Sequence, residues 1–245
     1  MNAAFFNAVR SSLFGGKLAQ AQVTGINAIL DAWARYGDGN LQRLAYVLAT
    51  PIVETGGRYE AIYEQGSKSY FDKYEPGTKI GKRLGNTLHG DGYRYRGRGL
   101  VQITGRANYA RVGREFGIDL LGNPDLALGL ELAARILVVG TLQGWFTGKG
   151  LSDYIDDVDD PDDADLKEFV QARRTVNGTD KATAIAEHAL AFEKALKAGG
   201  YRAAVPVGPA PQAPPPAKGK SGRPWPIIIT IAFGVAAAAL FFVRF

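Results

Sequence analysis

Cysteine is absent from the 245-residue sequence, and histidine occurs only twice, at His89 and His188. Without cysteine there is neither a disulfide framework nor a thiol nucleophile. A zinc hydrolase usually needs two or three histidine ligands, often in a short motif, and neither histidine lies in one. A G-x-S-x-G elbow for a serine hydrolase is also missing. We therefore expect no metal and no cofactor, and carboxyl groups remain as the candidates for catalysis.

Two glutamates, Glu54 and Glu64, lie ten residues apart in the segment ETGGRYEAIYEQGS. Glycoside hydrolysis usually needs one protonated and one ionised carboxyl group. A continuous helix would hold the two residues about 15 Å apart, too far to flank one bond. Gly56 and Gly57 are typical of a helix end, and a reversal there would allow the roughly 6.5–9.5 Å separation of an inverting enzyme. The alternative is that both are solvated surface glutamates.

The net charge of +5 hides a strong segregation of charge along the chain. Nine Lys or Arg residues lie between Lys79 and Arg114, where Asp91 is the only acid, and nine acids lie between Asp153 and Glu168. The basic stretch could bind nucleic acid, line a cleft for an anionic polysaccharide, or be a solvated face. No nucleic-acid-binding motif accompanies it, so we expect no nucleic-acid partner. The acidic run does not fit an EF-hand loop and indicates a solvated surface loop.

Helical periodicity dominates residues 1–204, with weak strand signal except over Gly99–Thr104. Pro51 is expected to kink or end a helix just before Glu54. Residues 66–100, rich in Gly, Lys, Arg and Tyr, are expected to form loops with short elements. Helices are predicted around Val23–Trp33, Leu41–Leu48, Ala107–Phe116, Leu126–Phe146, Ala164–Thr175 and Lys181–Ala198.

Composition changes abruptly at Val205, which divides the chain into three predicted parts. Residues 1–204 form the enzyme domain, 205–223 a proline-rich linker, and 224–245 a C-terminal transmembrane anchor. The apolar run Ile227–Val243 would span about 26 Å as a helix, close to a bilayer core of roughly 30 Å. Trp225 and Arg244 suit the two interfaces. The alternative is a buried core helix.

The charges around this run predict its orientation. Lys218, Lys220 and Arg223 precede it and only Arg244 follows. The positive-inside rule then places the enzyme domain on the cytoplasmic side of the inner membrane, held by a single-pass anchor. The segment MNAAFFNAVRSSLFGG has no long apolar region, so no cleaved signal peptide is expected.

Several long segments together resemble glycoside hydrolase family 19, which contains chitinases and the lysozyme-like endolysins of phages. YRGRGLVQITGRANYARVGREFGIDLLGNPDLAL resembles the central family motif, and ETGG and YEQGS are similar to its two catalytic segments. GWFTGKGLSDYI and RRTVNGTDKATAIAEHA resemble the phage and bacterial lysin branch. The resemblance covers roughly residues 1–200 and implies a mainly α, lysozyme-like domain with a substrate cleft between two lobes.

The resemblance also implies roles for individual residues. Glu54 would be the general acid, Glu64 the general base, and Thr104 would help to hold the attacking water. Burial should raise the pKa of the acid, and one of the arginines 98, 173 or 174 would keep the base ionised. The predicted substrate-binding residues are Gln102, Asn108, Arg98, Tyr95 and Asn177. The alternative for Gln102 and Asn108 is backbone capping in a turn, and for Asn177 a turn residue.

Three departures from the family pattern affect these roles. Val53 stands where family members commonly have His before the first catalytic Glu. Ala107 stands where the chitinases often have Tyr, which removes an aromatic contact. Glu60 competes with Glu64 for the base role, although the Gln-Gly-Ser after Glu64 favours Glu64.

The function predicted from the sequence is hydrolysis of β-1,4 glycosidic bonds in bacterial peptidoglycan by a two-glutamate inverting mechanism. The predicted partners are therefore peptidoglycan glycan strands and, through the anchor, the bacterial inner membrane. The first alternative is a chitinase acting on N-acetylglucosamine polymers. The second is a catalytically silent, membrane-tethered wall-binding protein, against which the presence of both glutamates argues.

Overall fold

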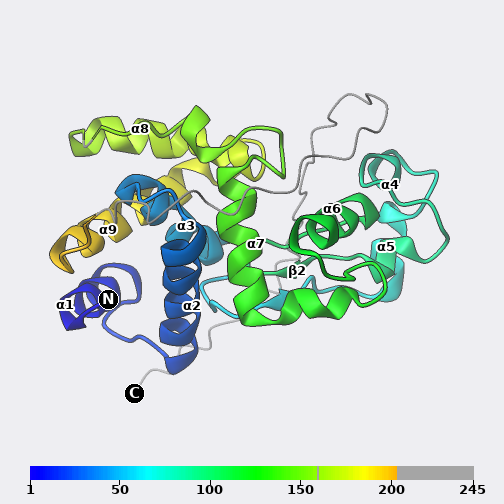
Figure 1. Cartoon of the computed structure of the whole chain (residues 1–245), viewed down its shortest axis with the longest axis horizontal. Helices are drawn as coiled ribbons and strands as arrows, with labels where there is room; N and C mark the ends of the chain where they lie inside the picture. The colour runs from blue at the N-terminus through cyan, green and yellow to red at the C-terminus, as the bar shows by residue number, and fades with distance from the viewer. Residues whose placement is uncertain (159, 203–245) are drawn as a thin grey trace, which may run out of the picture.

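The computed structural model describes residues 1–158 and 160–202, which form a mainly helical protein (Figure 1). No helix in this described part is long and apolar enough to cross a bilayer. The predicted linker and transmembrane anchor lie outside the described residues. The α-helices are α1 (Ala3–Leu13), α2 (Gln20–Tyr36), α3 (Leu41–Glu54), α4 (Lys79–Arg83), α5 (Asp91–Arg94), α6 (Arg106–Phe116), α7 (Leu130–Leu142), α8 (Asp162–Ala172) and α9 (Ala182–Ala198). The 3-10 helices are η1 (Lys68–Tyr74), η2 (Pro124–Leu128), η3 (Leu151–Asp153) and η4 (Arg173–Thr175), and the strands are β1 (Ile62–Tyr63) and β2 (Arg98–Gly99).

Helix α7 lies between two groups of elements (Figure 1). On one side are α1, α2, α3, α8 and α9, where α3, α8 and α1 pack on α9 and α2 packs on α7. On the other side are the short helices α4 and α5, with α6 and β2. Residues 42–51 of α3 are buried, which makes this helix a rigid support for the residue at its end.

Helix α3 ends just before the predicted glycine pair, Gly56 and Gly57, and not at Pro51. The side chain of Asn40 caps its start by accepting a hydrogen bond from the Arg43 N–H. The helix continues through Pro51 and ends at Glu54, so Pro51 does not end it early. Gly56 and Gly57 follow with φ angles of 63° and 72°, a conformation that glycine adopts without steric cost. The chain therefore turns away directly after Glu54.

A buried tyrosine fixes the path of the chain after this turn. Tyr59 has φ 58°, is fully buried, and its hydroxyl donates a 2.7 Å hydrogen bond to the carbonyl of Leu48 in α3. Its carbonyl lies so close to Gly25 of α2 that a side chain at Gly25 would collide with it. The close approach ties the segment between Glu54 and Glu64 to two helices.

The strands are shorter than the sequence predicts. β1 pairs antiparallel with β2, with Ile62 opposite Gly99 and Tyr63 opposite Arg98. A strand over Gly99–Thr104 is wrong because Gln102 has φ 55°, which turns the chain so that Ile103 pairs back with Arg98. The tight turn leaves β1 and β2 as a small platform beside Glu64.

The predicted helices are largely confirmed, with one exception. α2, α6, α8 and α9 match the predicted ranges to within a few residues. The predicted helix over Leu126–Phe146 is instead two elements, η2 and α7, separated at Gly129. Gly129 is extended, with φ −64° and ψ 121°, and this conformation interrupts a helix.

Candidate functional site

Glu54, the last residue of α3, is fully buried and forms an ion pair with Arg173. Its Oε1 accepts a 2.7 Å hydrogen bond from Nη1 of Arg173, which is itself only 1% exposed. The Nε of Arg173 donates to the carbonyl of Asp180 at 2.9 Å, which fixes the guanidinium. Oε2 of Glu54 has no hydrogen-bond partner among the described residues, so this is the oxygen on which a transferable proton can reside.

The electrostatic surroundings of Glu54 favour its protonated form. Burial raises the pKa of the Glu54 carboxyl, and this effect outweighs the lowering by Arg173. Tyr46, two turns earlier in α3, interacts electrostatically with both residues, and burial raises the pKa of its phenol. Because no charged phenolate forms at ordinary pH, Tyr46 supplies a neutral dipole to this environment.

Glu64, directly after β1, has a different environment and is partly exposed. Its Oε1 accepts a 2.8 Å hydrogen bond from the hydroxyl of Tyr74 in η1. Its Oε2 accepts a 3.1 Å hydrogen bond from the N–H of Gly97, and its own N–H donates to the Gly97 carbonyl at 2.8 Å. Two donors therefore orient the Glu64 carboxylate from opposite ends.

The prediction that Arg98, Arg173 or Arg174 pairs with Glu64 is wrong. Arg173 pairs with Glu54 instead, and Arg98 pairs with Asp125, with 2.9 Å between its Nη2 and Oδ1. Arg174 is exposed and hydrogen-bonds to Gln171. The side-chain oxygens of Glu64 accept hydrogen bonds from the Tyr74 hydroxyl and the Gly97 N–H instead.

Gly97 lies so close to the site that a side chain would not fit. A Cβ there would be 2.8 Å from Oε1 of Gln102 and 3.0 Å from Cβ of Glu64. Both distances are shorter than ordinary van der Waals contact. The sequence shows Gly97 only as one of several glycines, whereas the structure shows that it brings Glu64 and Gln102 together.

Gln102, Thr104 and Asn108 are buried and hydrogen-bond to backbone. Nε2 of Gln102 donates to the carbonyls of Ile62, at 2.9 Å, and Gly99, at 2.8 Å, which joins the turn to both strands. The Thr104 hydroxyl donates to the Gln102 carbonyl at 3.0 Å, and Nδ2 of Asn108 donates to the Thr104 carbonyl at 2.6 Å. The bonds of Gln102 and Asn108 are the backbone-capping interactions that the sequence predicts as the alternative to substrate binding. Contact of these residues with substrate stays a prediction.

Tyr95 and Arg98 are also directed inward. The Tyr95 hydroxyl donates to the carbonyl of Leu121 at 3.1 Å, and the Tyr95 ring packs against Tyr109. Arg98, 3% exposed, donates through Nη1 to the Tyr109 hydroxyl at 2.9 Å. Both side chains therefore hold the β2 region together.

Asn177 lies just after η4, close to the partner of Glu54. Its N–H donates to the carbonyl of Arg173 at 3.0 Å, and its Oδ1 accepts from the N–H of Gly178 at 2.8 Å. The side chain thus stabilises a turn, and its amide nitrogen is the group that a ligand could use. The structure places Asn177 on the Glu54 side of the site.

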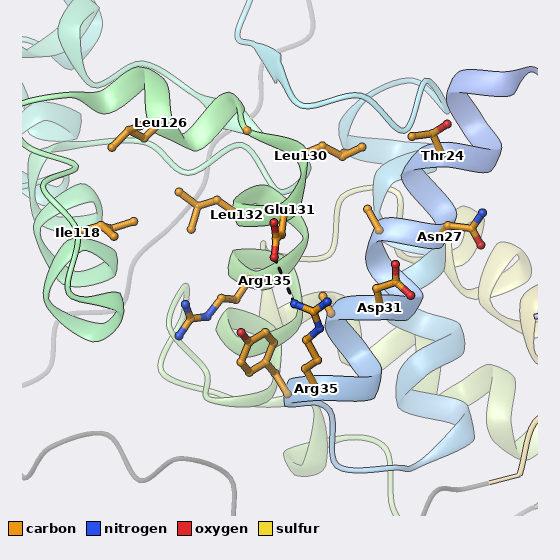
Figure 2. A pocket seen from close by; sticks show the side chains of 14 residues that line it. Thr24, Asn27, Asp31, Arg35, Ile118, Leu126, Leu130, Glu131, Leu132 and Arg135 are labelled. Carbon is orange, nitrogen blue, oxygen red and sulfur yellow. Dashed lines mark hydrogen bonds and ion pairs between the residues drawn. The ribbon is translucent and has the colours of Figure 1, made fainter.

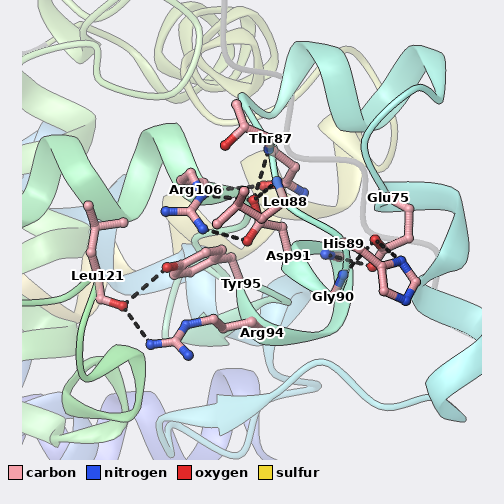
Figure 3. Close-up of polar contacts among 12 residues, drawn as sticks. Glu75, Thr87, Leu88, His89, Gly90, Asp91, Arg94, Tyr95, Arg106 and Leu121 are labelled. Atoms are coloured by element: carbon pink, nitrogen blue, oxygen red, sulfur yellow. Dashed lines mark hydrogen bonds and ion pairs between the residues drawn. The ribbon is translucent and has the colours of Figure 1, made fainter.

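Two surface hollows flank α7 and the basic stretch. One, of about 860 Å³, lies between α2 and α7, where Arg35 and Glu131 pair at 3.3 Å (Figure 2). The other, of about 900 Å³, is lined by residues within 88–98 and 121–125 and by Arg106. Figure 3 shows the polar contacts of several of these residues. Neither hollow is lined by Glu54 or Glu64.

One group of acidic residues has the spacing of a cation site. Carboxylate oxygens of Asp156, Asp160 and Glu168 lie within 4.8 Å of one another. Burial and the charge of Asp156 raise the pKa of Glu168. The residues lie at the surface around the start of α8, as expected for the acidic run, and take no part in the arrangement around Glu54.

A known protein family matches the segment that contains both glutamates. The family model described as chitinase class I matches residues 23–150, a segment that contains Glu54, Glu64 and the turn from Gly99 to Gly105. The chain belongs to glycoside hydrolase family 19. Arg173 and Asn177 lie beyond the matched segment.

Individual relatives in family 19 match shorter segments. A glycosyl hydrolase family 19 domain-containing protein of Haemophilus influenzae is 47% identical over 58 residues, 23% of this chain and 28% of that protein. Chitinase 8 of Oryza sativa subsp. japonica is 39% identical over 56 residues, 23% of this chain and 20% of that protein. The chain thus matches less than a third of the length of these relatives.

A solved structure shares the family 19 fold over most of the chain. Chitinase C of Streptomyces griseus superposes with a TM-score of 0.52 at 20% sequence identity, over 83% of this chain and 77% of that one. At this identity the similarity establishes the fold alone.

Proposed function

We propose that this chain is an inverting glycosidase that hydrolyses β-1,4 bonds of bacterial peptidoglycan. The observation that supports this most is the contrast between its two glutamates. Glu54 is fully buried with a raised pKa, and Glu64 is partly exposed and accepts two hydrogen bonds. Pairs of carboxyl groups in such different environments are typical of an acid and a base acting together.

In this mechanism Glu54 donates its proton to the glycosidic oxygen as the bond to the anomeric carbon breaks. Glu64 removes a proton from a water molecule, which attacks that carbon from the opposite face. The Thr104 hydroxyl donates to the Gln102 carbonyl, so its oxygen can still accept a hydrogen bond from this water. Tyr74 and Gly97 hold the base in place and Arg173 holds the acid.

The test uses the full chain in detergent with purified peptidoglycan, and mass spectrometry of the released fragments. We expect the wild type to release muropeptides with new reducing ends. Glu54→Gln and Glu64→Gln should each lower the rate at least about 100-fold, because each removes a proton-transfer group. Glu60→Gln, at an exposed position, is the matched control and should retain activity. If Glu60→Gln abolishes activity and Glu64→Gln does not, the base is Glu60.

Chitin is the second candidate substrate, because the family relatives Chitinase 8 and chitinase C are named as chitinases. Peptidoglycan and chitin share β-1,4-linked N-acetylglucosamine units. Release of chito-oligosaccharides from chitin, with no release from peptidoglycan, would favour this candidate. A folded wild type that binds peptidoglycan and cleaves neither polymer would be the silent wall-binding protein.

We also propose that residues 224–245 anchor the chain in the inner membrane, with the enzyme domain on the cytoplasmic side. The support is the apolar run Ile227–Val243 and the three basic residues before it. Protease added outside spheroplasts should leave the domain intact and should digest it once the membrane is permeabilised. Digestion in intact spheroplasts would contradict the orientation.

A further inference from the structure

Positive charge is concentrated in residues 66–114, which we call the basic lobe. It contains eleven Lys or Arg residues and three acids. Its elements η1, α4, α5 and α6 lie on the opposite side of α7 from α8, which carries much of the acidic run (Figure 1). The molecule is therefore electrostatically polarised across its width.

The basic lobe does not neutralise its own charge. Asp91 pairs with Arg106, with 2.7 Å between Oδ1 and Nη2, and Glu75 accepts hydrogen bonds from the N–H groups of Gly90 and Gly92 (Figure 3). Two of the three acids are thus held by internal contacts. The lysines of the lobe make no ion pair with any described residue; they are Lys68, Lys73, Lys79 and Lys82.

Among these lysines, Lys73 lies over the ring of Tyr74, which hydrogen-bonds to the candidate base Glu64. Its Nζ lies 3.4 Å from the centroid of the Tyr70 ring and 4.8 Å from that of the Tyr74 ring. Tyr74 is the residue whose hydroxyl donates to Glu64. Lys73 is partly buried, and its ammonium group lies against the ring of the tyrosine that contacts Glu64. It forms no ion pair with a described residue.

A second cation, Arg96, stacks on the tyrosine that precedes Glu64 in the sequence. The guanidinium of Arg96 lies 4.4 Å from the centroid of the Tyr63 ring and 4.1 Å from that of Tyr93. Tyr63 directly precedes Glu64, and Arg96 directly precedes Gly97. The region around Glu64 is thus bordered by two stacked cations from the same lobe.

We propose that Lys73, supported by Arg96, binds carboxylate groups of the substrate and thereby selects an acid-bearing glycan over a neutral one. The inference rests on the proposed function: peptidoglycan carries free carboxylates on its stem peptides and on lactyl groups that bear no peptide, whereas chitin is neutral. A cation without an internal counter-ion gains its partner when an anionic strand binds. Lys73 is a specificity residue in this proposal and takes no part in proton transfer.

The test compares three substrates for the full-length wild type and variants. These are native peptidoglycan, the same peptidoglycan with its carboxyl groups converted to methylamides, and a neutral chito-oligosaccharide. Lys73→Gln should raise KM on native peptidoglycan about tenfold, the order expected for one hydrogen bond to a charged group. It should leave KM unchanged on the two substrates that lack carboxylates. Lys73→Arg, which retains the charge, should restore most of the affinity.

The matched control is Lys167→Gln, which removes the same charge from an exposed position on α8. It should leave KM on all substrates unchanged. Added salt should reduce the difference between wild type and Lys73→Gln on native peptidoglycan. Circular dichroism should show the same helical signal for every variant.

Several results would overturn the proposal. Equal losses on charged and neutral substrates would mean that Lys73 acts only by positioning Tyr74. Equal wild-type activity on native and amidated peptidoglycan would contradict selection for carboxylates and would leave the proposed function intact. Retention on double-stranded DNA that depends on Lys73, with unchanged KM, would assign the lysine to nucleic acid. Cleavage of the chito-oligosaccharide alone would overturn both this inference and the proposed function.

Discussion

Arg173 and Glu54 are 119 residues apart in sequence and form an ion pair of 2.7 Å with 1% and 0% of their side chains exposed. The pair joins the end of α3 to η4. Two effects on the pKa of Glu54 oppose each other: burial raises it and the Arg173 guanidinium lowers it. Arg173 therefore limits how firmly Glu54 holds its proton.

Removing this cation should change the pH dependence of the reaction. In Arg173→Met the pKa of Glu54 rises further, because the carboxylate loses its only ion-pair partner among the described residues. The general acid then stays protonated to higher pH. We expect the alkaline limb of kcat/KM against pH to move to higher pH, alongside a lower maximum. Arg174→Met, at the exposed neighbour, should leave the limb in place.

The same substitution should make stability depend more strongly on pH. Breaking a buried ion pair costs about 3–5 kcal/mol when the remaining group stays charged. In the variant the folded state holds the Glu54 proton more tightly than the unfolded chain does, so stability falls as pH rises above the unfolded value of about 4.3. Denaturant unfolding at pH 4 and pH 8 should show a larger loss at pH 8. An equal loss at both values would contradict this reasoning.

Tyr74→Phe should lower kcat about tenfold, because a hydrogen bond to a charged group is worth more than about 1.4 kcal/mol. The substitution leaves the ring in place and removes the hydroxyl that donates to Oε1 of Glu64. Steady-state kinetics on peptidoglycan would measure this. Tyr36→Phe, on the opposite side of α7, is the control and should behave as wild type.

Gly97→Ala should lower activity more than stability. The added methyl group would displace Glu64 and Gln102, whose atoms lie 2.8–3.1 Å from its position. Overpacking of this kind costs about 1–3 kcal/mol of stability, and the displaced carboxylate would no longer meet its water. Gly178→Ala has open space around it and should retain wild-type stability. Full activity of Gly97→Ala would show that Glu64 need not occupy this position.

The local features of the fold could be predicted from the sequence because they depend on neighbours in the chain. The end of α3 at Glu54 follows from Gly56 and Gly57, and α9 follows from its apolar periodicity. The continuation of α3 through Pro51 was not predicted, since the tight packing of this helix overrides the local preference.

The contacts within the candidate site could not be predicted in the same way. The partners of the two glutamates, Arg173 and Tyr74, come from segments with no periodic or spacing signal relative to them. Their approach depends on the packing of α3 against α9 and on the turn at Gln102. The sequence indicates which residue types the chemistry needs. Tertiary packing determines which of these side chains come into contact.

The position of Glu54 at the last residue of the 14-residue helix α3 has an electrostatic consequence of its own. Aligned peptide dipoles give the C-terminal end of a helix a partial negative charge of about half an electron. An ionised Glu54 would add a full negative charge at that end, so the helix itself favours the protonated carboxyl. The backbone of α3, which no side-chain substitution removes, thus helps to keep the Glu54 carboxyl protonated. The positive charge of Arg173 offsets the partial negative charge of the helix end as well as that of the carboxylate.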